Sequence, residues 1–163
     1  MNPSLVGSEM CIRDSNTADE MLNEVKALIT NMDIFIGCAA VADFKPIDFH
    51  KSKIKKDHND EMSLKLIKNP DILQYASDHM KEKLVIGFSA ETDNVIENAK
   101  IKLLKKNLNM IICNDVSNKD IGFDSDDNEV HLITHDDVVK LTKTSKLKIA
   151  KQIIKSIEAL IAN

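Results

Sequence analysis

The stretch DIFIGCAAVADFKP, residues 33–46, decides the fold class of this chain. It begins as an apolar run typical of a buried strand, continues through small residues, and then presents Asp43 shortly before Pro46. A strand that only builds a core needs no small residues followed by a carboxylate. Small residues are needed where a ligand approaches the backbone closely, because small side chains leave the backbone accessible. We therefore predict a buried strand over 34–41 whose end contributes to a binding site.

The bulk composition is that of an ordinary globular domain. The chain has 163 residues, 43% of them hydrophobic and 29% charged, which suits one domain with a core. A net charge of −4 disfavours a nucleic-acid surface, and no apolar run approaches the roughly 20 residues of a membrane span. The cysteines form no C-x-x-C pair, which favours a reducing cytoplasm. We expect Cys38 and Cys113 to be small buried hydrophobic residues rather than nucleophiles.

The first residues differ from the rest. The segment MNPSLVGSEMCIRDS shows no helical or strand period and lacks the features of a signal peptide. It resembles translated adapter sequence, so we predict a non-native or disordered leader over 1–16 and a single domain over 17–163. We also expect the native chain to have begun earlier.

Helical and strand patterns alternate from Thr17 onward. The capping box TADE, with Thr17 as N-cap and Glu20 three residues later, predicts a helix to about Thr30. Further helices are predicted over 72–80, 95–108 and 146–161, strands over 62–66, 84–88 and 110–113, a loop over 43–60, and a terminal hairpin over 130–141. The apolar faces of the last two helices are predicted to carry Val95, Ala99, Leu103 and Leu104, and then Leu147, Ala150, Ile154, Ile157 and Ile161. The alternation predicts an α/β, Rossmann-like, mostly parallel sheet with helices on both faces and a C-terminal antiparallel hairpin.

Small or polar residues follow three of the predicted strands, where ligands of such sheets bind. These residues are Gly37, Ala39, Ala40 and Asp43, then Phe88 to Thr92, then Asn114 to Ser117. The loop KSKIKK, residues 51–56, and the lysines of the predicted 95–108 helix supply the positive charge that a polyphosphate needs, although Lys100 and Lys105 fit a solvated surface better.

Neither a Walker A motif nor G-x-G-x-x-G occurs. The five histidines form no metal cluster in the sequence pattern, so we assign them surface or turn roles and leave the metal ligands unknown.

Six segments, in order, resemble one known family. They are GCAAVADFKP (37–46), KIKK (53–56), LIKNPDIL (66–73), VIGFSAET (85–92), KKNLNMIICNDVS (105–117) and GFDSDDNEVHLI (122–133). Together they resemble bacterial phosphopantothenoylcysteine synthetase. This is the C-terminal half of the bifunctional phosphopantothenoylcysteine decarboxylase/synthetase flavoprotein of coenzyme A biosynthesis.

The resemblance implies a CTP-dependent acid–amino-acid ligase that uses Mg²⁺. The carboxylate of 4′-phosphopantothenate would attack the α-phosphate of CTP, giving an acyl-cytidylate and pyrophosphate, and the cysteine amine would then displace CMP to form an amide. FMN would belong only to the decarboxylase half, which this sequence lacks. The resemblance also implies a homodimer.

The resemblance further implies the site residues. Lys53 matches a loop lysine that reaches the triphosphate, and we predict it as the catalytic residue. The residues that match the nucleotide site are Gly37, Cys38, Ala39, Asp43, Lys53, Pro70, Asp71, Ile72, Leu73, Phe88, Lys102 and Lys106.

One departure from the family leaves alternatives open. A glycine-rich G-G-T-x-E segment, which the family carries near its start, is not present before Thr17, so we expect the activity of this chain to be impaired. The alternative is a non-catalytic nucleotide-binding or dimerisation module. A Rossmann oxidoreductase is disfavoured because the glycine fingerprint is missing. Selection of CTP over ATP does not follow from the residues themselves.

Overall fold

The computed structural model describes residues 12–48, 62–116 and 125–162. The chain divides into two compact units, one comprising Met1–Leu28 and Val41–Ile72, and the other Ile29–Ala40 and Leu73–Asn163. The leader predicted over 1–16 lies largely outside the described residues, as do Lys53 and most of the predicted 43–60 loop.

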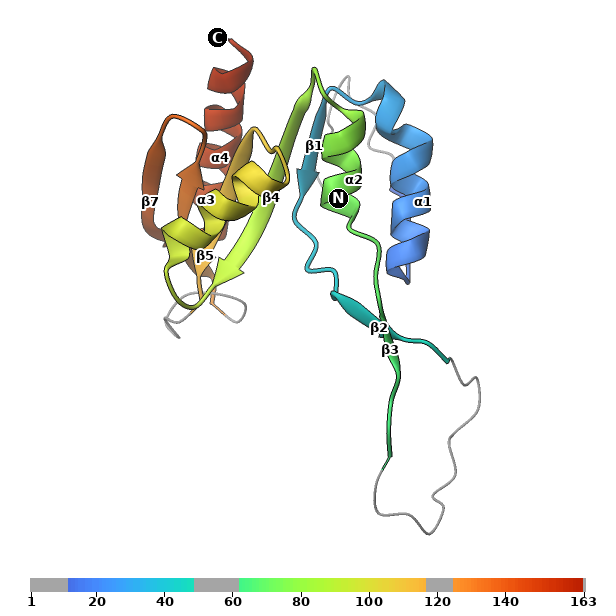
Figure 1. Cartoon of the computed structure of the whole chain (residues 1–163). Helices are drawn as coiled ribbons and strands as arrows, with labels where there is room; N and C mark the ends of the chain where they lie inside the picture. The colour runs from blue at the N-terminus through green and yellow to red at the C-terminus, as the bar shows by residue number, and fades with distance from the viewer. Residues whose placement is uncertain (1–11, 49–61, 117–124, 163) are drawn as a thin grey trace, which may run out of the picture. The chain divides into compact units, whose positions relative to one another are not determined.

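A five-stranded sheet organises the larger unit (Figure 1). Its order is β1-β4-β5-β6-β7, with β1 parallel to β4, β4 parallel to β5, and the last two pairings antiparallel. The strands are β1 (Ile34–Gly37), β4 (Leu84–Glu91), β5 (Met110–Asp115), β6 (Asp127–Ile133) and β7 (Val138–Ser145). The predicted α/β fold, with a mostly parallel core and a C-terminal hairpin, is confirmed.

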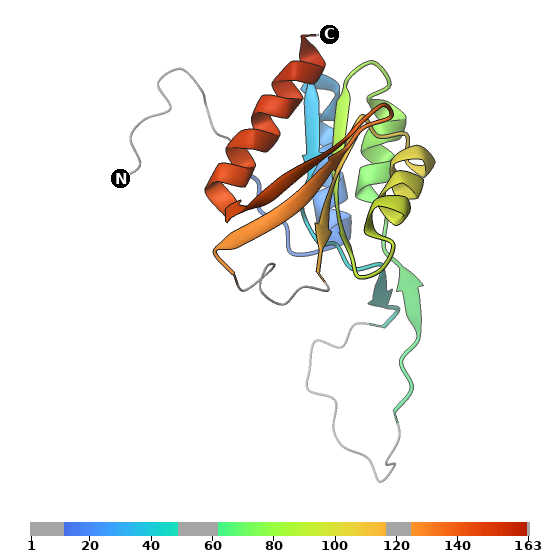
Figure 2. The same ribbon diagram turned by 90° about the vertical axis from the view of Figure 1, so that its left-hand side faces the viewer.

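Helices cover both faces of this sheet, as Figure 2 shows for α3 (Val95–Lys105) and α4 (Lys146–Ile161). On the α4 face, Ile149, Ile153 and Ile157 pack against alternate residues of the strands. The strand residues of this cluster are Ile86, Met110, Ile112, Val130 and Leu132. Successive side chains of a strand point to opposite faces, so the intervening buried residues Val85, Ile111, Cys113 and Ile133 supply the core beneath α3.

Two glycines make room for α2 (Ile72–His79) against the sheet. Gly37 and Gly87 are register partners in β1 and β4. A Cβ on Gly87 would lie 2.7 Å from Leu73 Cδ2 and 3.0 Å from Leu108 Cδ1, and one on Gly37 would lie 3.2 Å from Leu73 Cδ1. The Leu73 side chain therefore packs in the space that Cβ atoms at these two positions would fill.

The smaller unit holds α1 (Ala18–Leu28) and a two-stranded antiparallel ribbon of β2 (Phe44–Pro46) and β3 (Leu66–Lys68). The predicted N-cap is confirmed, since the Glu20 amide donates to Thr17 Oγ1 at 3.2 Å. The Glu20 carboxylate reaches back to the Asn16 amide, one residue before the cap, at 2.7 Å. Lys45 of the ribbon forms an ion pair with Asp19 of α1.

Several predicted boundaries were wrong. The strand predicted over 34–41 ends at Gly37, because the small residues that follow offer little apolar area to bury. The strand predicted over 84–88 instead continues to Glu91, since β5 pairs with it over its whole second half. Two predictions failed in the smaller unit. First, β2 lies within the predicted 43–60 loop. Second, only Leu66 of the half-buried strand predicted over 62–66 lies in β3, and Met62 and Leu64 are both exposed.

The helix faces show a second kind of error. The bounds of α4 are those predicted, but its buried residues are Ile149, Ile153 and Ile157, whereas Leu147 and Ile154 of the predicted face are exposed. In α3, Ala99 and Leu103 are buried as predicted and Leu104 is exposed, and the helix ends at Lys105 rather than 108. In both helices more than one apolar stripe was available, and the sequence period did not select between them.

Candidate functional site

Parallel strands place their carboxyl ends at one edge of a sheet, so the ends of β4 and β5 define a candidate site in the larger unit. Glu91 and Asp115, the last residues of these strands, are register partners. The Val116 amide donates to the Glu91 carbonyl at 3.0 Å, which extends the pairing one residue beyond β5. The backbone that carries the Glu91 carboxylate is therefore fixed.

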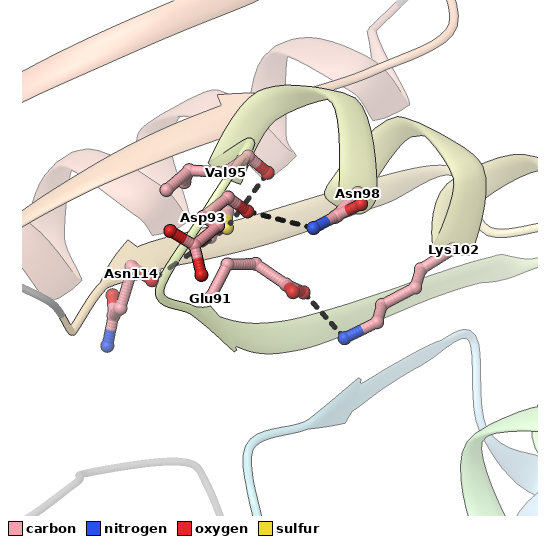
Figure 3. Close-up of polar contacts among 7 residues, drawn as sticks. Glu91, Asp93, Val95, Asn98, Lys102 and Asn114 are labelled. Carbon is pink, nitrogen blue, oxygen red and sulfur yellow. Dashed lines mark hydrogen bonds and ion pairs between the residues drawn. The ribbon is translucent and has the colours of Figure 1, made fainter.

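The turn from β4 into α3 is closed by its own polar side chains (Figure 3). Asn98 Nδ2 donates to the Asp93 carbonyl at 2.8 Å, and Thr92 Oγ1 donates to Asp93 Oδ2 at 3.1 Å. Asn94 precedes the first helical residue with φ 45°, a left-handed conformation that asparagine tolerates better than most residues. This turn sets the direction of α3 relative to the strand end.

An ion pair joins α3 to the end of β4. Lys102 Nζ lies 2.5 Å from Glu91 Oε1, and Figure 3 shows the two side chains pointing toward each other. The Glu91 side chain is 10% exposed and that of Lys102 45%, so the carboxylate is nearly buried while the ammonium faces solvent. Lys106 follows one turn later, its amide donating to the Lys102 carbonyl at 3.0 Å. Two of the predicted phosphate lysines therefore share one side of α3.

The two described cysteines differ. Cys113 is buried, its Sγ lying 3.7 Å from the Val95 carbonyl, and burial raises the pKa of its thiol. The expectation that Cys113 is a buried hydrophobic residue is confirmed. The same expectation for Cys38 was wrong, because the chain leaves the sheet after Gly37 and exposes Cys38. Partial shielding of its sulfur nevertheless raises the pKa of the Cys38 thiol.

Phe88 and the α3 lysines come from opposite faces of the sheet. Phe88 packs against the cluster beneath α4, whereas its neighbour Ser89 shares a register row with Cys113, which contacts the start of α3. Leu73, also predicted as a nucleotide residue, lies over Gly37 and Gly87. The structure thus brings Lys102 and Lys106 together, and Gly37 and Leu73 together, but does not place Phe88 beside the lysines.

Ala39 lies in the larger unit, where it is exposed beyond the end of β1, and the remaining described candidates belong to the smaller unit. The Asn69 amide donates to the Asp43 carbonyl at 2.8 Å, and Asn69 Nδ2 donates to the Ala42 carbonyl at 2.8 Å. These bonds tie the segment around Asp43 to the turn that leads into Pro70, Asp71 and Ile72. Ile72, the first residue of α2, is buried. Each nucleotide-binding role remains a prediction.

Glu91 is the site residue to which the sequence assigned no role. It stands among the polar residues that follow a predicted strand, but nothing at a spacing of eleven residues links it to Lys102. Their contact depends on the length of β4 and on the turn that follows. Among the described residues, no three His, Cys, Asp or Glu side chains gather closely enough to hold a metal ion. Nor is any described helix long and apolar enough to cross a membrane.

A parallel sheet core with helices on both faces and lysines beside its strand ends defines an α/β protein of the Rossmann-like class. The chain belongs to the family of DNA/pantothenate metabolism flavoprotein C-terminal domains, which it matches over residues 6–161.

Curated relatives give the same result. The chain is 43% identical over 141 residues to the coenzyme A biosynthesis bifunctional protein CoaBC of Borreliella burgdorferi, covering 85% of this chain and 35% of that protein. It is 45% identical over 128 residues to CoaBC of Escherichia coli K12, covering 76% of this chain and 31% of that protein. The chain therefore spans about a third of the length of these relatives.

Solved structures agree on the fold. A crystal structure of the C-terminal domain of CoaBC superposes with a TM-score of 0.72 at 33% identity, covering 91% of this chain and 64% of that one. A DNA/pantothenate metabolism flavoprotein from Streptococcus pneumoniae superposes with the same TM-score at 22% identity, covering 91% of this chain and 70% of that one, and supports the fold alone.

Proposed function

We propose that this chain is the CTP-binding part of a phosphopantothenate–cysteine ligase of coenzyme A biosynthesis. Family membership and the CoaBC relatives support the reaction class. The single structural observation that carries the proposal is Lys102 of α3 beside Glu91 at the end of β4, with Lys106 one turn later at the C-cap of the helix. Ammonium groups at such an edge suit a triphosphate, whose charge they neutralise.

The proposed reaction has two steps. The carboxylate of 4′-phosphopantothenate attacks the α-phosphorus of CTP, the bond to the bridging oxygen breaks, and pyrophosphate leaves. The amine of cysteine then attacks the acyl carbon and releases CMP, losing a proton as the amide forms. In this scheme Lys102, Lys106 and the loop residue Lys53 offset phosphate charge, and Asp43 with the backbone near Gly37 holds the nucleoside.

Mg²⁺ would accompany the nucleotide. Magnesium in nucleotide sites is commonly held by phosphate oxygens, waters and one or two carboxylates. When bound, the ion would offset charge on the departing pyrophosphate. We further propose a homodimer and a cytoplasmic location, with 4′-phosphopantothenate, cysteine and CTP as small-molecule substrates.

Calorimetry and product analysis test this function. CTP should bind the 163-residue chain, and Lys102→Met should weaken that binding about tenfold, a loss of about 1.4 kcal/mol. Lys100→Met, which removes an exposed charge from the same helix, is the matched control and should change affinity much less. Equal losses for the two variants, or no CTP binding by the unaltered chain, would contradict the proposal.

The same samples separate the alternatives. Pyrophosphate release that requires 4′-phosphopantothenate, followed by cysteine-dependent CMP formation, supports the ligase, at a rate that we expect to be low for this chain alone. Nucleotide binding with no CMP under any condition supports a non-catalytic module. Parallel titration with ATP decides which base is selected.

A further inference from the structure

We propose that Glu91 is a positioning residue whose carboxylate fixes the Lys102 ammonium for the nucleotide phosphates. This inference rests on the proposed function, because it takes the phosphate role of Lys102 as given. It gives a specific role to Glu91, which the sequence pattern placed only among the residues that follow a predicted strand.

The first argument is the asymmetry of burial in the ion pair. The Glu91 side chain is 10% exposed, whereas that of Lys102 is 45% exposed. A nearly buried carboxylate is costly unless a charged or hydrogen-bonding partner satisfies it, and Lys102 Nζ at 2.5 Å is that partner. A nearly buried carboxylate without a cation would also repel a polyphosphate. The ion pair therefore keeps the Glu91 carboxylate in the interior and presents the Lys102 ammonium to solvent.

The second argument is that the two members are anchored by different means. Glu91 is the last residue of β4, paired with Asp115 on β5, and its carbonyl accepts from the Val116 amide at 3.0 Å. Lys102 projects from α3, whose start is held by the Asn98 side chain on the Asp93 carbonyl at 2.8 Å. The sheet thus fixes the backbone that carries the carboxylate, and the ion pair restrains a lysine side chain that would otherwise sample many rotamers.

The third argument is donor capacity. An ammonium group has three N–H donors. The contact with Glu91 Oε1 uses one of them, and the exposure of Lys102 leaves the ammonium accessible to a phosphate from solvent. Lys102 can therefore keep its carboxylate partner and bind phosphate at once. Because its position is set beforehand, less side-chain entropy is lost when the nucleotide binds.

The decisive variant is Glu91→Asp, which keeps the charge but draws the carboxylate back by one methylene, about 1.5 Å. The pair is then stretched, while the negative charge remains and is less well offset. Both effects weaken triphosphate binding. Glu91→Gln would be harder to interpret, because removing a negative charge favours triphosphate binding while weakening the contact with Lys102 opposes it. We expect Glu91→Asp to weaken CTP binding about tenfold, or about 1.4 kcal/mol, and to change cytidine binding by less than about twofold.

A double-mutant cycle distinguishes positioning from a merely structural role. In a Lys102→Met background, Glu91→Asp should cause no further loss of CTP affinity, because the residue through which it acts is gone. Melting temperatures of all four proteins report folding. A Glu91→Asp variant that binds CTP as tightly as the unaltered chain, or that loses cytidine and CTP affinity in equal proportion, would overturn the proposal.

A measurement on the unaltered sequence covers a variant that fails to fold. After reductive ¹³C-methylation of lysines, the Lys102 signal, assigned with Lys102→Arg, should stand apart from those of exposed lysines before any ligand is added, and should move with CTP but not with cytidine. A Lys102 signal that coincides with the exposed lysines would refute a fixed ammonium. Failure of the unaltered chain to bind both CTP and tripolyphosphate is a separate result, which would overturn the proposed function and this inference with it.

Discussion

The Leu73 side chain of α2 occupies the space above Gly87 of β4, where a Cβ would lie 2.7 Å from Leu73 Cδ2. Glycine at this position is therefore required by helix–sheet packing. We predict that Gly87→Ala lowers the free energy of unfolding by about 1–3 kcal/mol, as overpacking of a core does. Urea unfolding followed by circular dichroism measures the change.

The partner of this contact supplies the control. If the clash with Leu73 is the cause, Leu73→Ala should recover part of the loss when combined with Gly87→Ala, so the two changes should not be additive. Gly37→Ala should cost less, because its added Cβ would lie 3.2 Å from the nearest Leu73 atom. Additive losses would show that the stability change has another origin.

Adjacent isoleucines of α4 test which face of the helix is buried. Ile153 is 7% exposed and Ile154 48% exposed. We predict that Ile153→Ala costs about 2–5 kcal/mol of unfolding free energy, because it leaves a cavity under the sheet, and that Ile154→Ala costs less than about 1 kcal/mol. Denaturant titration of both variants provides the comparison, and equal losses would contradict the assigned face.

The Glu129–Lys140 pair on the β6–β7 hairpin gives a pH dependence. The two charged groups lie 2.8 Å apart, and the hydrogen bond from Lys140 lowers the pKa of the Glu129 carboxyl. A lowered folded-state pKa means that the stabilisation is complete above the unfolded value, about 4.3, and is lost as the pH falls through the lower folded value.

Unfolding at two pH values measures this contribution. Both side chains are partly exposed, so we expect at most about 1 kcal/mol at neutral pH. Glu129→Gln should lower stability at pH 7 and lower it less at pH 3, as the carboxylate becomes protonated, and Lys140→Met should have the same effect. A loss of equal size at both pH values would mean that the ion pair is not responsible.

Cys38 follows the end of β1 and tests the proposed nucleotide site chemically. Its thiol is exposed, and partial shielding raises its pKa, so less thiolate is present at neutral pH than in a free cysteine. We predict slow iodoacetamide labelling at pH 7 that rises at higher pH than for a free thiol. A Cys11→Ser background allows mass spectrometry to compare Cys38 with the buried Cys113.

Ligand protection extends that prediction. If the nucleotide lies against the backbone of residues 37–39, CTP should slow the labelling of Cys38, and cytidine should slow it less. Labelling of Cys113 under native conditions should stay low with or without ligand, because the residue is buried. Unchanged Cys38 labelling at saturating CTP would remove residues 37–39 from the nucleotide site.

Local patterns along the chain were enough to predict the order and type of the main elements. Caps and apolar periods are local signals, so the N-cap at Thr17 and the bounds of α4 follow from neighbouring residues. The alternation of buried strands and helices likewise fixed the parallel core, because parallel strands need crossover connections.

Which surfaces pack against each other is seen only in the folded chain. The seating of Leu73 over Gly87 and the pairing of Glu91 with Lys102 join residues whose spacing matches no local period. The buried stripe of α4 has helical spacing, but it is one of several apolar stripes on that helix, and packing selected it. Such contacts depend on where each strand stops and how the next helix is directed. A local pattern records which side chains are apolar or charged, but the packing of distant segments selects the partner of each one.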